Sequence, residues 1–127
     1  MNSLFRSFDN GETWDSVFFY PQGSFASFCN IGDSVVLLGT WGGIFRSVDS
    51  CQTWSQVLDT YNSEVFNDIV IDTDGTFYAG STSYISGGSP GGVYRSDDHG
   101  ASWYLIGLEY HFISSLKFNS ESTLFAS

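Results

Sequence analysis

The chain has 127 residues, a length that favours one domain, and 18% of its residues are aromatic, with 14 Gly and only 2 Pro. The chain contains fourteen Asp and Glu residues but only four Lys and Arg residues, which gives a formal net charge of −10. This charge repels phosphate backbones and anionic membranes, which argues against a nucleic-acid partner. No run of about 18 apolar residues is present, so no membrane insertion is expected. Aromatic residues suit strands and Gly suits tight turns, so the composition favours an all-β fold.

Three segments along the chain align without gaps. Residues 4–17 are LFRSFDNGETWDSV, residues 44–57 are IFRSVDSCQTWSQV, and residues 93–106 are VYRSDDHGASWYLI. Their starts are 40 and 49 residues apart, which is the size of a four-stranded propeller blade. The repeat therefore predicts an array of blades.

A second element lies between these segments. Residues 27–40, 66–80 and 113–127 each contain an apolar run, a polar turn and another apolar run, which predicts a hairpin. In chain order, the expected strands are 4–7 and 13–18; 27–31, 35–39, 44–47 and 53–58; 68–71, 76–80, 93–96 and 102–106; and 115–118 and 123–126. A long Gly- and Ser-rich loop is expected over 81–92.

The expected domain is a partial β-propeller of four-stranded antiparallel blades. Residues 1–20 supply the last two strands of one blade, 24–59 and 65–107 are whole blades, and 112–127 supply the first two strands of another. A ring needs about four to eight blades. We therefore expect either further blades of the same protein or self-association to close the ring.

The turn between the third and fourth strands of each blade carries a Ser-x-Asp-x-Gly-x-Thr-Trp pattern. Its residues are Ser7, Asp9, Gly11, Thr13 and Trp14 in the first copy; Ser47, Asp49, Thr53 and Trp54 in the second; and Ser96, Asp98, Gly100, Ser102 and Trp103 in the third. The Asp side chain can accept hydrogen bonds from its own turn, Gly permits a left-handed backbone, and Trp buries a large ring. The second copy has Cys51 in place of Gly, which predicts a distorted turn.

This pattern resembles the Asp-box, or bacterial neuraminidase repeat, of sialidases, sortilin-type receptors, xyloglucan-cleaving endoglucanases and photosystem II assembly factors. The resemblance implies a propeller fold, a structural role for the box residues, and a secreted or bacterial cell-surface location; the chain itself shows no signal peptide. It identifies a fold rather than an activity. No metal and no cofactor is expected, and Cys29 and Cys51 are expected to be unpaired.

Sialidases that share the repeat bind a substrate carboxylate with three arginines. In this chain Arg6, Arg46 and Arg95 all directly precede the box Ser. A position repeated in every blade predicts a packing role, such as stacking on a box Trp, rather than a substrate clamp.

The connections opposite the box turns form the expected ligand face. Its aromatic candidates for binding are Tyr20, Trp41, Tyr61, Tyr84 and Tyr110, and its carboxylates include Asp59 with the weak catalytic candidates Glu64 and Glu109. Two functions remain open. The first is a non-catalytic binding or scaffolding module whose ligand is a glycan or a protein. The second is part of a sialidase-like or endoglucanase-like glycoside hydrolase whose catalytic residues lie mostly outside this chain.

Overall fold

The computed structural model describes residues 2–20, 23–32, 34–85 and 88–127, and this part of the chain consists of strands and turns without a helix. No segment of it is a helix able to cross a membrane. In chain order the strands are β1 (Asn2–Arg6), β2 (Asp15–Tyr20), β3 (Phe25–Ile31), β4 (Val35–Thr40), β5 (Gly43–Ser47), β6 (Ser55–Asp59), β7 (Glu64–Ile71), β8 (Phe77–Ser83), β9 (Gly92–Ser96), β10 (Tyr104–Gly107), β11 (Leu116–Phe118) and β12 (Leu124–Ala126).

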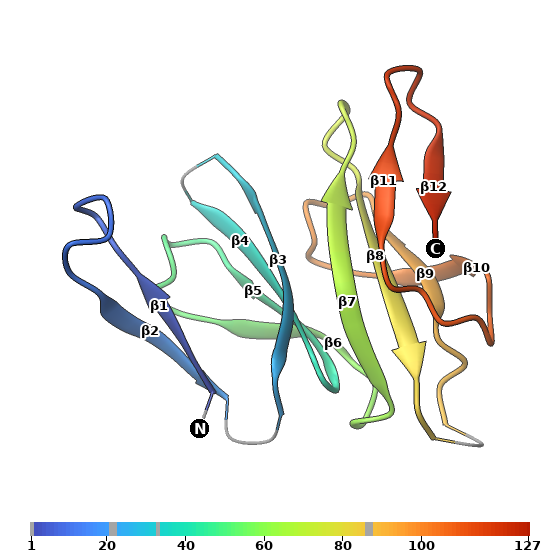
Figure 1. Ribbon diagram of the computed structural model, residues 1–127, viewed down its shortest axis with the longest axis horizontal. Coiled ribbons are helices and arrows are strands. Elements are labelled where there is room, and N and C mark those ends of the chain that lie inside the picture. Colours follow the sequence, from blue (N-terminus) through green and yellow to red (C-terminus); the bar gives the residue numbers. More distant parts are fainter. Residues whose placement is uncertain (1, 21–22, 33, 86–87) are drawn as a thin grey trace.

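The strands form two four-stranded sheets between two two-stranded sheets. Each strand pairs antiparallel with its sequence neighbour, giving the orders β1-β2, β3-β4-β5-β6, β7-β8-β9-β10 and β11-β12. Figure 1 shows the sheets side by side, with the β3–β4, β7–β8 and β11–β12 turns at one end of the molecule. The all-β class and this strand order are as the sequence predicted, and the sheets are blade-like.

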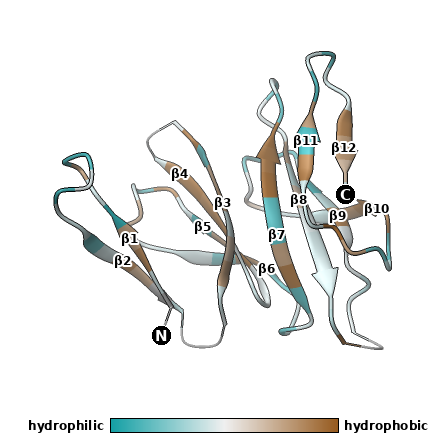
Figure 2. Ribbon diagram, in the orientation of Figure 1, coloured by the Kyte–Doolittle hydropathy of each residue, from teal (hydrophilic) through white to brown (hydrophobic). Residues whose placement is uncertain are grey.

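The main core lies between the two four-stranded sheets. Leu37 and Ile44 of the first sheet pack against Phe66, Phe77 and Tyr94 of the second, and all five are buried. Ser27 Oγ donates a hydrogen bond of 2.7 Å to the Phe66 carbonyl, which joins β3 to β7. Figure 2 shows the hydrophobic stretches of β3, β4 and β7. A smaller core of Val93, Ile113 and Leu116 joins the second sheet to β11–β12.

The three box turns (7–14, 47–54 and 96–103) have the same hydrogen-bond pattern. In the first, Asp9 Oδ1 accepts from the Thr13 backbone N–H at 2.8 Å, Asp9 Oδ2 accepts from Thr13 Oγ1 at 2.5 Å, and Ser7 Oγ donates to Asp9 Oδ1 at 2.8 Å. Asp49 and Asp98 accept equivalent bonds in the other turns. Each turn is thus tied together by one carboxylate.

The second box turn is not distorted, contrary to expectation. Cys51 adopts a left-handed φ of 66°, where Gly11 and Gly100 have 91° and 80°. The Cys51 N–H still donates to Ser47 Oγ at 2.9 Å, as the Gly100 N–H does to Ser96 Oγ. The carboxylate and hydroxyl bonds hold the backbone in this conformation in spite of the added Cβ. Both cysteines are free thiols.

Two of the box arginines bind the next box turn along the chain. Arg6 Nη1 donates to the Ser50 carbonyl, and Arg46 Nε donates to the His99 carbonyl at 2.9 Å. Ser50 and His99 occupy the same repeat position. Arg95 instead forms an ion pair with Asp97 at 2.6 Å. The expectation that these side chains stack on a box Trp is wrong, because the aromatic rings under Arg6 and Arg95 are those of Phe8 and Tyr78.

Candidate functional site

Three exposed aromatic rings form a continuous strip on the face opposite the box turns. Trp41 and Tyr84 are stacked with ring centroids 5.7 Å apart and planes 20° apart, and Tyr84 and Phe112 are stacked at 6.5 Å and 24°. The exposed fractions are 37% for Trp41, 63% for Tyr84 and 72% for Phe112. The rings come from the β4–β5, β8–β9 and β10–β11 connections, so the strip crosses both four-stranded sheets.

Backbone bonds between neighbouring connections hold this strip in place. The Trp41 indole N–H donates to the Asn62 carbonyl at 2.9 Å, and the Tyr84 N–H donates to the Ser63 carbonyl at 3.2 Å. The N–H of Ile113, the residue after Phe112, donates to the Ser81 carbonyl at 3.2 Å. The scaffold therefore fixes the Trp41 ring and the backbone that carries the other two rings, which reduces the order that has to be gained on binding.

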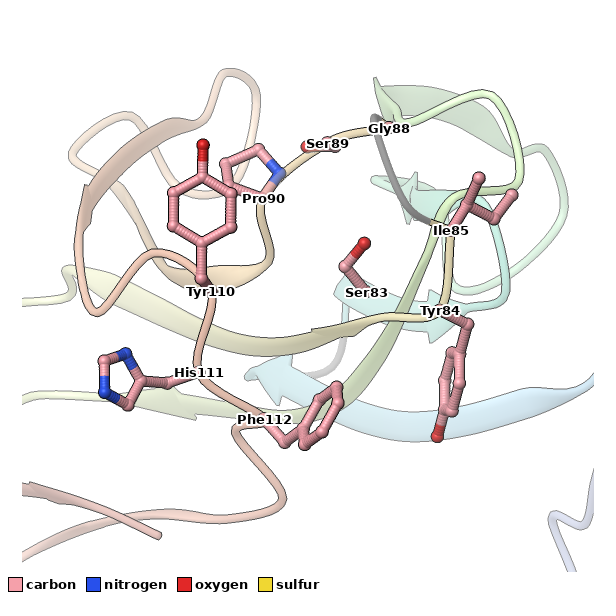
Figure 3. Close-up of a pocket in the computed structure, with 9 residues that line it drawn as sticks. All are labelled: Ser83, Tyr84, Ile85, Gly88, Ser89, Pro90, Tyr110, His111 and Phe112. Carbon is pink, nitrogen blue, oxygen red and sulfur yellow. The ribbon is translucent and has the colours of Figure 1, made fainter.

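A pocket of about 570 Å³ opens beside the strip, bounded by the β8–β9 and β10–β11 connections. Its lining contains Ser83, Tyr84, Ile85, Gly88, Ser89, Pro90, Tyr110, His111 and Phe112. Figure 3 shows the Ser83 hydroxyl pointing into the space between Ile85 and Pro90, with Tyr110 beside Pro90. A hollow lined by both hydroxyl groups and apolar side chains is suited to a ligand with both hydroxyl groups and apolar faces.

The predicted aromatic candidates do not all lie on this surface. Tyr61 and Tyr110 are exposed, at 86% and 85%, whereas Tyr20 is buried and its hydroxyl donates to the Trp41 carbonyl at 2.8 Å. Tyr20 therefore supports the strip from beneath instead of contacting a ligand. Phe112 was missed, because it lies at the junction of a loop and an expected strand, where alternation gives no indication of exposure.

Glu64 is also not where the sequence placed it. It belongs to β7, which begins earlier than expected, and its side chain is fully buried. Glu64 Oε2 accepts from Ser81 Oγ at 2.5 Å, and Oε1 accepts from the Tyr94 hydroxyl at 2.9 Å. Burial and the adjacent Glu64 carboxylate raise the pKa of Tyr94 to about 12, so its phenol stays a hydrogen-bond donor. Glu64 is therefore buried and does not contact a ligand at the surface.

The extent of the β8–β9 loop is a further correction. β8 continues to Ser83, so the connection before β9 is shorter than the loop predicted over 81–92; Ser86 and Gly87 lie outside the described residues. The exposed acidic candidates on this face are Asp59 and Glu109. Asp59 Oδ1 accepts from the Tyr61 N–H at 2.8 Å, and the Glu109 carbonyl is 3.0 Å from His111 Nδ1. No cluster of three metal-ligating side chains occurs among the described residues.

Comparison with known proteins shows a shared fold. No protein-family model and no curated protein matches the chain. Two crystal structures of the extracellular domain of BT4673 from B. thetaiotaomicron do, one described as a one-component system and the other as a hybrid two-component system. Their TM-scores are 0.71 and 0.73, at 16% and 15% identity, over 98% of this chain. The chain spans only 18% of the length of either.

Proposed function

We propose that the chain is a non-catalytic binding module in an extracellular Asp-box propeller, in which its sheets are blades, and that it binds a neutral carbohydrate on the strip formed by Trp41, Tyr84 and Phe112. The observation that carries the proposal is the strip itself: three exposed, nearly parallel rings, with the Trp41 indole N–H hydrogen-bonded to a neighbouring connection. The apolar C–H face of a sugar packs on an aromatic ring, while its hydroxyls bind polar groups beside it.

Charge favours a neutral ligand over an acidic one. The net charge of −10 repels anions, and the arginines Arg6, Arg46 and Arg95 are engaged in contacts with box turns or with Asp97. The extracellular location of the two structural neighbours supports the same location for this chain. Surface-exposed rings beside a hollow with both polar and apolar lining suit recognition rather than bond cleavage.

The proposal is tested by titrating the purified chain with neutral oligosaccharides and measuring heat of binding. We expect Trp41→Ala or Tyr84→Ala to weaken binding at least tenfold, about 1.4 kcal/mol, because each removes one ring of the strip. Tyr61→Ala is the matched control, since Tyr61 is an exposed aromatic residue outside the strip, and it leaves the affinity unchanged.

The same titrations are followed for release of reducing ends. Turnover that disappears in Glu109→Gln would favour the glycoside hydrolase alternative. Absence of binding to every neutral glycan, or equal binding by the Trp41→Ala variant, contradicts the proposal.

A further inference from the structure

A second cavity, of about 460 Å³, lies between the β6–β7 and β8–β9 connections. Figure 1 shows the end of the molecule where β7 begins and β8 ends, which is where these connections lie. The lining includes Thr60 from the first connection and Tyr94 of β9. The cavity adjoins the pocket beside the strip, with which it shares Ile85, Gly88 and Ser89, but no ring of the strip lines it. It is therefore a separate candidate site.

The cavity occupies a position that is filled by aromatic rings one sheet earlier in the chain. The box repeats align Tyr20 with Thr60 and Phe45 with Tyr94. Tyr20 is buried, and its ring meets the edge of the Phe45 ring with 5.2 Å between the centroids. Thr60 has no ring with which to fill the corresponding space against Tyr94. The hollow therefore follows from a smaller residue at one repeated position.

The Thr60 hydroxyl is left without a partner inside the protein. The Thr60 N–H donates to the Gly42 carbonyl at 2.9 Å, and the Thr60 carbonyl accepts from the N–H and the hydroxyl of Ser63. Thr60 is only 6% exposed, yet among the described residues its Oγ1 has no hydrogen-bond partner. A buried hydroxyl without a partner costs free energy. A ligand in the cavity that Thr60 lines can supply the missing bond.

The charges around the cavity favour a cation. The lining includes the Asp59 carboxylate, and none of its described residues is Lys, Arg or His. Behind the lining, the Tyr94 hydroxyl donates to Glu64 Oε1 at 2.9 Å, and Glu64 is fully buried. No cationic side chain in the described part of the chain pairs with Glu64, so its hydroxyl partners supply hydrogen bonds but no positive charge. A cation in the adjoining cavity would offset part of the cost of this buried carboxylate.

The polar groups of the lining can accept hydrogen bonds from such a cation. Because the Tyr94 hydroxyl donates to Glu64, the contact of 3.2 Å between Ser89 Oγ and the Tyr94 hydroxyl has Ser89 as its donor. This leaves the lone pairs of Ser89 Oγ for a ligand. Asp59 Oδ1 accepts from the Tyr61 N–H, and its second oxygen can accept another bond.

From these observations we infer that the cavity binds a small organic cation that carries a primary ammonium group. The three N–H donors of an ammonium group match the acceptors on Thr60, Ser89 and Asp59. Tyr61 and Tyr94 also line the cavity, and aromatic rings attract cations. The inference does not depend on glycan binding, because it uses no ring of the strip.

The first test is an NMR titration of the 127-residue chain with benzylammonium chloride, and with benzyl alcohol as a neutral probe of the same size. We expect benzylammonium to shift the backbone amide signals of Tyr61, Ser63 and Ser89. The alcohol should bind about tenfold more weakly, because it lacks the positive charge. Equal affinity of the two probes overturns the inference. Sodium or calcium chloride that shifts these signals at lower concentration than benzylammonium overturns the assignment to an ammonium group.

Three variants locate the site. Thr60→Tyr introduces the residue found at Tyr20 and fills the cavity, so benzylammonium binding should be lost. Asp59→Asn keeps an oxygen for the Tyr61 N–H but removes the charge, and the affinity should fall about fivefold. Asp74→Asn is the matched control, because it removes the same formal charge from an exposed residue in the β7–β8 turn, and it leaves the affinity unchanged.

Undiminished binding by a folded Thr60→Tyr variant overturns the inference, as do equal effects of Asp59→Asn and Asp74→Asn. If Thr60→Tyr is unfolded, the two Asp variants and the neutral probe still decide the outcome. Glycan binding is measured in separate titrations, so the failure of either proposal is distinguishable from the failure of the other.

Discussion

Cys51 shows how much a single turn residue can be constrained by its neighbours. A non-glycine residue at a left-handed φ is strained, yet here the Ser47 and Asp49 side chains hold the same bonds as in the turns that contain Gly. The strain is therefore carried by the native state and should be relieved by removing the Cβ.

We expect Cys51→Gly to stabilise the chain by about 1 kcal/mol, partly offset by the greater freedom of Gly in the unfolded chain. The measurement is the urea midpoint of each variant at the same protein concentration. Cys51→Ala keeps the Cβ and removes only the thiol, so it should give no gain. If both variants shift the midpoint equally, the thiol and not the backbone is responsible.

The residue types in the box turns were predictable because their chemistry is local. Asp9 bonds to residues within four positions of it, so the sequence contains the whole interaction. Tyr20 and Glu64 were misplaced because their surroundings come from distant segments: Tyr20 bonds to Trp41, and Glu64 bonds to Ser81 and Tyr94. An alternating pattern locates a strand, but it does not indicate which residues near the strand ends are buried by other segments.

At the scale of strands, the contact between β4 and β7 depends on the absence of a side chain at Gly39. A Cβ there would lie 2.1 Å from Ser27 Oγ and 2.5 Å from the Phe66 carbonyl oxygen. The first obstacle is a side-chain hydroxyl, but the second is backbone and cannot rotate away. The close approach of the two four-stranded sheets at this position therefore requires glycine.

Gly39→Ala should destabilise the chain by about 2 kcal/mol, the usual cost of overpacking a core. The cost should persist in a Ser27→Ala background, because the Phe66 carbonyl remains in place; double-mutant thermal denaturation measures this. Loss of the penalty in that background would show that the Ser27 hydroxyl alone excludes the side chain.

The order and type of the strands followed from the repeats, but their ends did not. β7 begins at Glu64 and β8 continues to Ser83, because these residues pair with each other beyond the apolar run that marked each strand. Bulges such as that between Phe66 and Asp68 shift the alternation by one residue. Two of the three rings of the aromatic strip were predicted, because Trp41 and Tyr84 lie in connections that the repeat locates. Phe112 was not predicted, because it lies outside the repeated pattern.

For the molecule as a whole, the three box carboxylates make the free energy of unfolding depend on pH. Hydrogen bonds from the hydroxyls of Thr13, Thr53 and Ser102, followed by backbone N–H groups, lower the pKa of Asp9, Asp49 and Asp98 to about 2. An unfolded Asp has a pKa of about 3.9. Because the folded pKa is the lower one, this stabilisation is complete above about pH 4 and is lost as the pH falls through about 2.

We therefore expect the urea midpoint to fall between about pH 4 and pH 2. Solvent screening keeps each exposed carboxylate's share small, but the three act in the same direction. In Asp98→Asn the acid slope should be shallower than in the unaltered chain, since one titrating group is gone. A midpoint that is constant down to pH 2 would show that the box carboxylates do not stabilise the fold through their charge.

The contacts made by Arg6 and Arg46 also give the series of sheets a direction. In both contacts the guanidinium belongs to the earlier sheet and the turn carbonyl to the following sheet, so donor and acceptor come in the same order along the chain. Two such sheets facing each other with like sides would oppose two cations or two carbonyl oxygens, and neither arrangement forms a bond. Sheets that carry this arginine and this turn are therefore directional, and a series of them can be extended in only one sense.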